Sequence, residues 1–382
     1  MFENDPVEDL DKLVTELRLD ARRGPDEEGF DDSRLIQWLK RVRDLGGADL
    51  LLVSGAAATI RVRGAFVAAS TVPLDPTHIV QAVAPLLPTR LLERHRAGES
   101  VDLAFSRPGL GRFRMNLHYE RGRPAAAIRA LPTTIPRLNQ LNFSHDISVL
   151  SRLPRGLVLI GGPTGSGKTT TLAAIVAEMN NRDQRHIISV EDPIEYEHPH
   201  GTCLIEQIEI GVDSPDFATA LRAAVRQAPD VIVLGEMRDP ESMRIALTAA
   251  ETGHLVFATL HTTDVASAIG RITDGFPTER QNAVRQELAM ALAAVLTQTL
   301  LRTVQGALTP AAELMMVSYG ARQHIRKNAL QHLNQEITIT RKAGSFTLEE
   351  SLAALVRAQK LDRQDALMKA AHPDELTTLL AG

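Results

Sequence analysis

Short apolar runs alternate with helical stretches through the second half of the chain. The strand-like runs lie at residues 156–161, 186–190, 231–234 and 255–260, and helical segments separate them. Strands that alternate with helices in this way are typical of a mostly parallel sheet covered by helices. The pattern therefore predicts an α/β domain over residues 147–382, with helices dominating after residue 279.

The first half of the chain has a different pattern, in which β-like runs outnumber helices. Apolar residues recur at helical spacing from residue 35 to residue 45, and a second helical segment lies near residues 79–95. The β-like runs lie at residues 49–53, 59–62, 66–69, 101–105, 111–118 and 125–130. This mixture predicts a compact α+β domain over residues 33–130. Residues 131–146 form the expected linker, because Pro132 and Pro136 oppose helix.

Two further segments bear on where the protein resides. The apolar stretch at residues 288–301 is interrupted by Thr297, Gln298 and Thr299, and it falls short of the ~18 to 20 residues of a membrane helix. We interpret it as a buried helix and expect no direct membrane insertion. Residues 1–32 carry twelve acidic and four basic side chains, which predicts a flexible acidic leader, with a docking or regulatory segment as the alternative. This terminus does not resemble a secretory signal.

Composition narrows the classes of protein further. Hydrophobic residues make up 44% and charged residues 23%, which is usual for a globular chain and argues against disorder. The formal net charge of −5 provides no general attraction for nucleic acid, so we expect no such partner. Cys203 is the only cysteine, which excludes an internal disulfide and a zinc site of several thiolates. A reducing, cytoplasmic location is expected.

One segment carries a complete phosphate-loop pattern, Gly-x-x-x-x-Gly-Lys-Thr, between a predicted strand and a predicted helix. Its glycines allow backbone N–H groups to face phosphate oxygens, and the helix N-terminus favours an anion. We expect Lys168 to bridge the β- and γ-phosphates of ATP and Thr169 to bind Mg²⁺. The expected nucleotide-binding residues are Gly162, Pro163, Thr164, Gly165, Ser166, Gly167, Lys168, Thr169 and Thr170.

Hydrolysis also needs a carboxylate that activates water, and two acidic segments are candidates. One is residues 191–195, which follow a predicted strand, and the other ends the strand at 231–234 with Glu236, as a Walker-B segment should. A third strand is flanked by His254 and His261, which are candidates for a nucleotide sensor. Because seven positions separate these histidines, a regular strand would place them on opposite faces, so they need not share one role.

With these motifs assembled, the sequence resembles the secretion ATPase superfamily, and within it the retraction ATPases of type IV pili, the PilT/PilU family. The resemblance runs over about residues 33–370 and implies a RecA-like ATPase core, a smaller N-terminal α+β (PAS-like) domain and a helical C-terminal region. It implies that Glu195 is the general base and that Glu236 supports Mg²⁺ and water. His254 and His261 match its histidine box. The arginines that match its nucleotide-contacting positions are Arg114, Arg129, Arg222 and Arg226.

The chain departs from the family pattern at several positions. Residues 48–51 keep only part of an N-terminal signature, Ala228 replaces an acidic residue before the Walker-B strand, and Ile208 replaces a cation. Pilus-assembly and type II secretion ATPases usually carry a four-cysteine zinc module, which one cysteine cannot form. Residues 320–326 retain Arg322, Ile325 and Arg326 of a motif that retraction requires. These features favour retraction over assembly.

The resemblance implies an ATP-driven homohexamer that acts on pilus retraction through an inner-membrane platform protein. Such a motor is peripheral at the inner face of the cytoplasmic membrane, and a second retraction ATPase is a possible partner. Three alternatives stay open: a PilU-like accessory ATPase, a type II or type IV secretion or pilus-assembly ATPase, and a regulatory nucleotide-binding subunit with little turnover.

Overall fold

The computed structural model describes residues 33–381, and the predicted leader at residues 1–32 lies outside this range. The chain divides into two compact units between Thr133 and Thr134, inside the segment expected to be the linker. Each unit has its own sheet and its own buried core, and each is described by itself.

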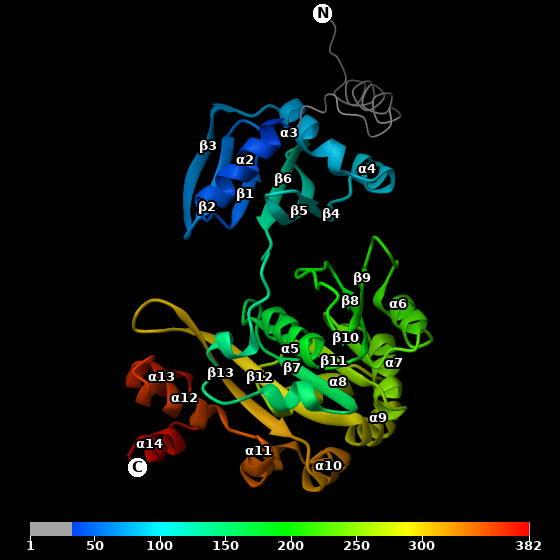
Figure 1. Ribbon diagram of the computed structural model, residues 1–382, viewed down its shortest axis with the longest axis vertical. Coiled ribbons are helices and arrows are strands. Elements are labelled where there is room, and N and C mark those ends of the chain that lie inside the picture. The colour runs from blue at the N-terminus through cyan, green and yellow to red at the C-terminus, as the bar shows by residue number, and fades with distance from the viewer. Residues whose placement is uncertain (1–32, 382) are drawn as a thin grey trace, which may run out of the picture. The chain divides into compact units, whose positions relative to one another are not determined.

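The N-terminal unit is an antiparallel six-stranded sheet in the order β3-β2-β1-β6-β5-β4 with helices packed on one face (Figure 1). Its elements are α2 (Ser33–Asp44), β1 (Asp49–Leu52), β2 (Ala57–Val62), β3 (Ala65–Pro73), α3 (Pro76–Val83), η1 (Ala84–Leu86), α4 (Thr89–Arg96), β4 (Val101–Arg107), β5 (Gly111–Glu120) and β6 (Arg123–Ala130). The single helical segment expected near residues 79–95 is three pieces. Pro85 and Pro88 account for the interruptions, because proline lacks the N–H that continues a helix.

Alternation of side chains along the strands builds the core of this unit. In β5, Phe113, Met115 and Leu117 are buried, while the residues between them are partly exposed. They pack in one cluster with the apolar stripe of α2, which includes Leu35 and Leu39. The predicted α+β domain is therefore a one-layer sheet that buries a single face beneath helices.

The C-terminal unit is built on a seven-stranded sheet in the order β13-β12-β7-β11-β10-β8-β9. All neighbouring pairs are parallel except β12 with β13. Its strands are β7 (Gly156–Gly161), β8 (His186–Glu191), β9 (Leu204–Glu209), β10 (Val231–Leu234), β11 (Leu255–Leu260), β12 (Leu292–Arg302) and β13 (Leu308–Met316). This mixed α/β sheet agrees with the predicted fold class.

Helices cover both faces of this sheet. Their bounds are α5 (Lys168–Arg182), α6 (Phe217–Ala224), α7 (Pro240–Glu251), α8 (Val265–Asp274), α9 (Thr278–Ala291), α10 (Tyr319–Arg326), α11 (Leu333–Ile339), α12 (Leu348–Arg357), α13 (Arg363–Lys369) and α14 (Pro373–Ala381). Short 3-10 helices, η2 (Leu138–Leu141), η3 (Ser148–Arg152), η4 (Leu330–His332) and η5 (Arg341–Ala343), complete the unit.

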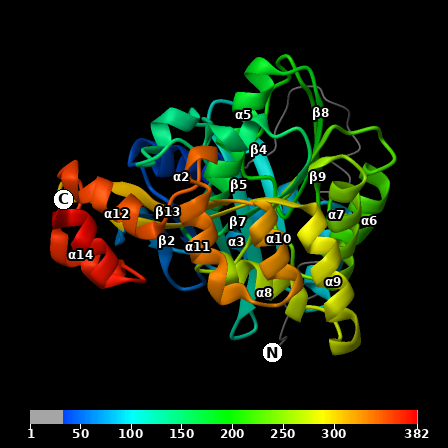
Figure 2. The same ribbon diagram turned by 90° about the horizontal axis from the view of Figure 1, so that it is seen from below.

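The central strand β7 is buried on both faces and divides two cores. Leu157 and Leu159 pack against the helices of one face, α6 to α11, whereas Val158 and Ile160 pack against α5 and η3 on the other. Figure 2 views the unit from the side that carries α8, α9, α10 and α11. A strand buried on both faces reads as a continuous apolar run, which explains why its prediction from sequence was possible.

The prediction of a buried helix at residues 288–301 was wrong for most of its length. Helix α9 ends at Ala291, and β12 begins at the next residue and pairs with both β7 and β13. The helical C-terminal region thus begins after a two-stranded hairpin. A short apolar run has the same local pattern in a buried helix and in a buried strand, so only its distant hydrogen-bond partners decide. Among residues 33–381, no helix combines the length and apolar character needed to cross a membrane.

Candidate nucleotide-binding site

The phosphate loop joins the end of β7 to the start of α5. Gly162, Gly165 and Gly167 have φ angles of 153°, 77° and 87°, which favour glycine. A Cβ on Gly162 would lie 2.4 Å from the backbone oxygen of Gln298. The loop is therefore folded tightly against β12, and its first glycine has no space for a side chain.

Lys168 is buried at the first position of α5, with 8% of its surface exposed. Its Nζ donates hydrogen bonds to the carbonyl oxygens of Gly162 (2.8 Å) and Pro163 (3.0 Å). Burial lowers the pKa of this ammonium, while the nearby carboxylates of Glu236 and Glu195 act in the opposite direction. The structure thus brings the predicted lysine close to both predicted carboxylates.

Gln298 on β12 supports the phosphate loop through a side-chain hydrogen bond. Its side chain is 4% exposed, and Nε2 donates to the carbonyl oxygen of Ser166 over 2.7 Å. This residue was absent from the sequence-based site, because 132 positions separate the two partners and β12 was expected to be helix. It is a structural member of the site that a local motif cannot reveal.

Gln298→Leu should raise the KM for ATP about tenfold with a small change in kcat, because it leaves a buried carbonyl of the loop without its donor, a loss of about 1–3 kcal/mol. Steady-state ATP hydrolysis over a range of ATP concentrations measures this. Gln305→Leu, an exposed change in the turn between β12 and β13, is the matched control. An unchanged KM in Gln298→Leu would contradict this role.

The candidate acidic segment at residues 191–195, called the aspartate box from here on, starts at the last residue of β8 and is held by side chains of β8 and β9. Glu191 accepts hydrogen bonds from Ser189 (2.7 Å) and Gln207 (3.1 Å). Burial raises the pKa of Glu191 despite these two bonds. The Tyr196 hydroxyl lies 3.0 Å from the Thr170 hydroxyl, so the box is joined directly to α5. Glu191 lies in the candidate acidic segment but was given no role from the sequence, and Gln207 was not predicted to belong to the site.

A small cavity lies between α5 and the ends of β8, β9 and β10. Its volume is about 30 Å³, and its lining includes Thr169, Glu191, Tyr196 and Gly235. This space is sufficient for about one ordered water molecule among polar groups. The predicted Mg²⁺ ligand Thr169 and the carboxylate-bearing residue Glu191 therefore line the same cavity.

Glu236 follows β10 at the same edge of the sheet. It forms an ion pair with Arg238 (2.8 Å), and its other carboxylate oxygen lies 3.3 Å from Nε2 of His261. Burial acts to raise the pKa of Glu236, but Arg238 and His261 lower it overall. The structure thus joins the predicted Walker-B acid to one of the two predicted histidines, and it adds Arg238, which sequence reasoning had not selected.

The two histidines of the third motif lie at opposite ends of β11. His261 follows the strand at the phosphate-loop edge, whereas the His254 carbonyl pairs with the N–H of Gly156 at the start of β7. Six residues at about 3.3 Å each put roughly 20 Å between them. Within one chain, His254 therefore lies at the end of β11 that is remote from the phosphate loop, and its role stays a prediction. The alternative that they have separate roles agrees with this placement.

The four candidate arginines lie in different surroundings. Arg114 and Arg129 belong to the N-terminal unit, where they pair with Asp102 (3.2 Å) and Asp49 (2.8 Å). Arg222 on α6 pairs with Glu241 and lines a cavity of about 440 Å³ that also contains Asp192, Arg238 and Asp239. Arg226 is exposed just after α6. Their proposed roles stay predictions.

The segment at residues 320–326 lies within α10, which begins at Tyr319. Arg322 donates to the carbonyl oxygens of Ala289 and Met290, the latter over 2.8 Å, and Ile325 is fully buried. Arg326 contacts the Met290 sulfur at 3.0 Å. The retained residues of this motif therefore connect α10 to the end of α9.

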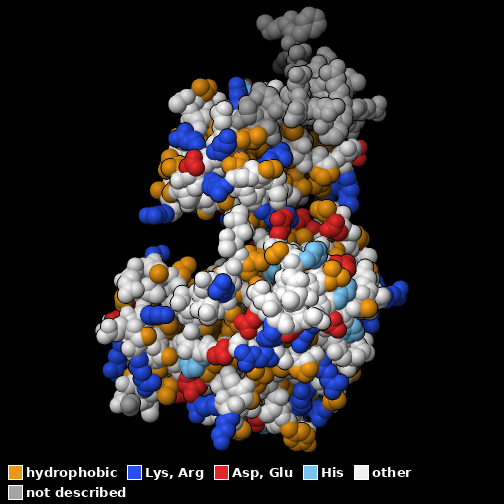
Figure 3. Space-filling view, viewed as in Figure 1, with side chains coloured by type: hydrophobic (Ala, Val, Ile, Leu, Met, Phe, Trp, Pro, Cys, Tyr) orange, Lys and Arg blue, Asp and Glu red, His pale blue; other side chains and the backbone are white. Residues whose placement is uncertain are grey.

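Surface charge is dispersed on the face that Figure 3 shows. Lys and Arg side chains are interspersed with acidic and hydrophobic ones over each unit and form no single continuous stripe there (Figure 3). The absence of a nucleic-acid partner stays a prediction from net charge.

A parallel sheet whose central strand enters a phosphate loop, with carboxylates on neighbouring strand ends, defines a P-loop ATPase. The comparisons then give the family. The model of the family described as "Type II/IV secretion system protein" matches residues 125–374. The chain belongs to this secretion ATPase family, in its PilT/PilU branch, as the resemblance in its motifs predicted.

Two relatives and one solved structure show this branch. The chain is 38% identical to the type IV pilus retraction ATPase PilT of Pseudomonas aeruginosa, over 86% of this chain and 96% of PilT. It is 34% identical to the type IV pilus ATPase PilU of the same organism, over 90% of each chain. A crystal structure of the pilus retraction motor PilT with bound ADP matches with a TM-score of 0.83 and 37% identity, over 90% of this chain and 98% of that chain.

Proposed function

We propose that this chain is the ATP-hydrolysing subunit of a homohexameric motor that powers type IV pilus retraction, and with it twitching motility. The observation that carries the proposal is the similarity to PilT over nearly the whole of both chains. The motor works at the inner face of the cytoplasmic membrane and passes its motion to an inner-membrane platform protein.

In the proposed reaction, the loop N–H groups and Lys168 hold the β- and γ-phosphates of ATP. Glu195 takes a proton from the attacking water as its oxygen bonds to the γ-phosphorus and the bond to the bridging oxygen of ADP breaks. Glu236, held by His261, orients that water. The influence of both carboxylates on the pKa of Lys168 supports this assignment.

Magnesium fits the oxygen donors at this site. Thr169 offers a hydroxyl and Glu236 a carboxylate, which are ligands that Mg²⁺ prefers. Within residues 33–381, no three His, Cys, Asp or Glu side chains gather into a metal cage, so the ion would be held jointly with nucleotide oxygens and partly through water. When bound, Mg²⁺ supplies charge that neutralises the phosphates.

Arginines are the proposed source of further charge on the transferred phosphoryl group, an effect worth roughly 10³-fold or more in rate. The candidates are Arg114, Arg129, Arg222 and Arg226, acting from the same subunit or from a neighbour in the ring. A nucleotide bound where two subunits meet would couple hydrolysis to motion about the segment at residues 131–136.

Deletion of this gene should abolish twitching in the host, and the wild-type chain should restore it whereas Lys168→Ala should not. In parallel, the purified protein should have a mass of about six times 41.7 kDa by light scattering. Normal twitching in the deletion strain would contradict retraction. A fully active, monodisperse monomer would contradict the ring.

A second candidate is an accessory, PilU-like role beside another retraction ATPase. The similarity to PilU over 90% of each chain favours it, as does Ala228 before the Walker-B strand. An accessory subunit would hydrolyse ATP in vitro, yet its deletion would impair retraction only under load or only when the second ATPase is weakened. Force measurements on single pili separate the two roles.

A further inference from the structure

Four segments of the chain meet in one row of the sheet behind the phosphate loop. Gly161, the last residue of β7, is in register with Leu260 of β11 and with Thr297 of β12. Thr297 is in turn directly opposite Glu313 of β13. The row therefore begins at Leu260, next to His261, crosses β7 at the start of the phosphate loop and ends at Glu313.

Glu313 holds the far end of the histidine-box loop. Its Oε1 accepts hydrogen bonds from the N–H of Val265 (2.8 Å) and from the Thr297 hydroxyl (3.1 Å). Residues 261–264 thus extend from β11 past β7 and β12 to reach β13, and His261 at their beginning lies 3.3 Å from Glu236. The Glu313 carboxylate thus fixes the loop that carries His261, the residue that contacts Glu236.

The contacts across this row are close. A Cβ on Gly161 would lie 2.8 Å from the Thr262 hydroxyl and 2.9 Å from Cγ2 of Thr297. Gln298, the next residue of β12, holds the phosphate loop through Ser166. A shift of Thr297 or of the loop at Thr262 would therefore be felt at the nucleotide site, because close-packed interiors transmit displacement.

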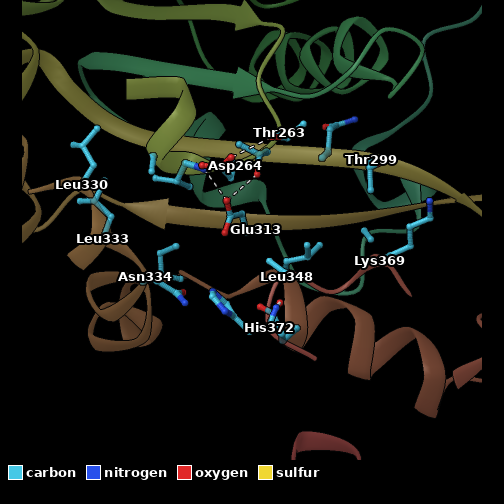
Figure 4. A pocket seen from close by; sticks show the side chains of 18 of the residues that line it. Thr263, Asp264, Thr299, Glu313, Leu330, Leu333, Asn334, Leu348, Lys369 and His372 are labelled. Atoms are coloured by element: carbon cyan, nitrogen blue, oxygen red, sulfur yellow. Dashed lines mark hydrogen bonds between the residues drawn. The ribbon is translucent and has the colours of Figure 1, made fainter. Parts of the chain in front are cut away.

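A cavity of about 520 Å³ opens beside Glu313 (Figure 4). In that view, one Glu313 oxygen makes the two dashed hydrogen bonds, while the other is turned toward the side of the cavity that carries Asn334, Leu348 and His372. Solvent and protons can thus reach this carboxyl group. The other charged or titratable groups that line the cavity are Asp264, Glu349, Lys369 and His372.

These surroundings set the ionisation of Glu313 close to neutral pH. Burial raises the pKa of Glu313 to about 7, against the hydrogen bonds from Val265 and Thr297 and with the help of the charges on Asp264 and Glu349. The carboxyl is therefore largely neutral below pH 7 and charged above it. A charged carboxylate is the stronger acceptor for both donors.

We propose that Glu313 is a positioning residue for ATP hydrolysis, whose charged form holds the histidine-box loop, and with it His261, in place beside Glu236. Protonation weakens this hold, so turnover declines on acidification. The inference rests on the ATPase activity proposed above and assigns to it a pH response located outside the nucleotide site.

The test is the pH profile of ATP turnover in the full-length protein between pH 6 and pH 8.5. Wild-type kcat should rise roughly fivefold through pH 7, since hydrogen bonds to charged groups exceed neutral ones by about 1 kcal/mol. Glu313→Gln keeps an acceptor but cannot ionise. Its kcat at pH 8 should fall to about the low-pH wild-type value without a step near pH 7, and its KM for ATP should stay within twofold.

Two further variants keep the test decisive if Glu313→Gln folds poorly. Thr297→Val removes a donor to the charged form and should move the step to higher pH, whereas Glu349→Gln removes a neighbouring negative charge and should move it to lower pH. A step of wild-type size and midpoint in Glu313→Gln, or unmoved midpoints in the other two, would overturn the proposal. Absence of any wild-type turnover would instead contradict the proposed function.

Discussion

Lys168→Ala should lower kcat/KM for ATP by about 10³-fold, the loss expected when a preorganised charge at the phosphates is removed. In the structure this lysine is buried at the first turn of α5. The charges of Glu236 and Glu195 both act to raise its pKa. Alanine retains the helix but supplies no cation to the β- and γ-phosphates. Both ATP binding and turnover should therefore fail together.

Steady-state phosphate release and binding of a fluorescent ATP analogue would measure the two effects separately. Lys342→Ala is the matched control, because that lysine is exposed and far along the chain from the phosphate loop. A thermal melt of each variant checks that the unit still folds. Turnover within tenfold of wild type in a folded Lys168→Ala protein would show that this loop is not the hydrolytic site.

Glu195→Gln should reduce kcat by about 10²- to 10⁴-fold and leave the KM for ATP nearly unchanged, as expected for a lost general base. The neighbouring Glu191 provides a sharp comparison. Its carboxylate accepts hydrogen bonds from Ser189 and Gln207, whereas within residues 33–381 no side-chain hydrogen bond occupies that of Glu195. This difference favours Glu195 over Glu191 as the proposed base.

Glu191→Gln preserves the shape of the box and should therefore cost less than about tenfold in kcat. Pre-steady-state measurements of the chemical step would compare the two variants directly. If Glu191→Gln proved the more damaging change, the base would be Glu191, and the bonds from Ser189 and Gln207 would then be orienting it. If both were harmless, neither acid of the box would take the proton.

Prediction of the fold was most successful where short-range patterns are sufficient. Strands β7, β8, β10 and β11 are mainly apolar, largely buried runs, and α5 follows a phosphate loop, so local sequence identifies each of them. Strand β9 was missed because its residues are only partly buried at the sheet edge. Strand β12 was taken for helix because its burial depends on β7 and β13.

The site divides in the same way. Motif chemistry predicted Lys168, the acidic segment at residues 191–195 and Glu236, because phosphate and water chemistry requires such groups next to strand ends, and the family resemblance then implied Glu195 within that segment. Their neighbours Gln207 and Gln298 could not be found, because each acts through a hydrogen bond to a segment distant in sequence. Even His254, which stands in a recognisable motif, is separated from the site by the length of its strand.

Sequence alone determined the class of this protein: a phosphate loop between a strand and a helix, the order of acidic and histidine motifs, and the secretion ATPase family they resemble. Those features are local, because backbone geometry and phosphate binding depend on adjacent residues. The tertiary structure decided which histidine faces Glu236, which side chains brace the phosphate loop, and that Glu313 anchors the loop after β11. Such relations depend on strand order and register, which arise from hydrogen bonds between distant segments.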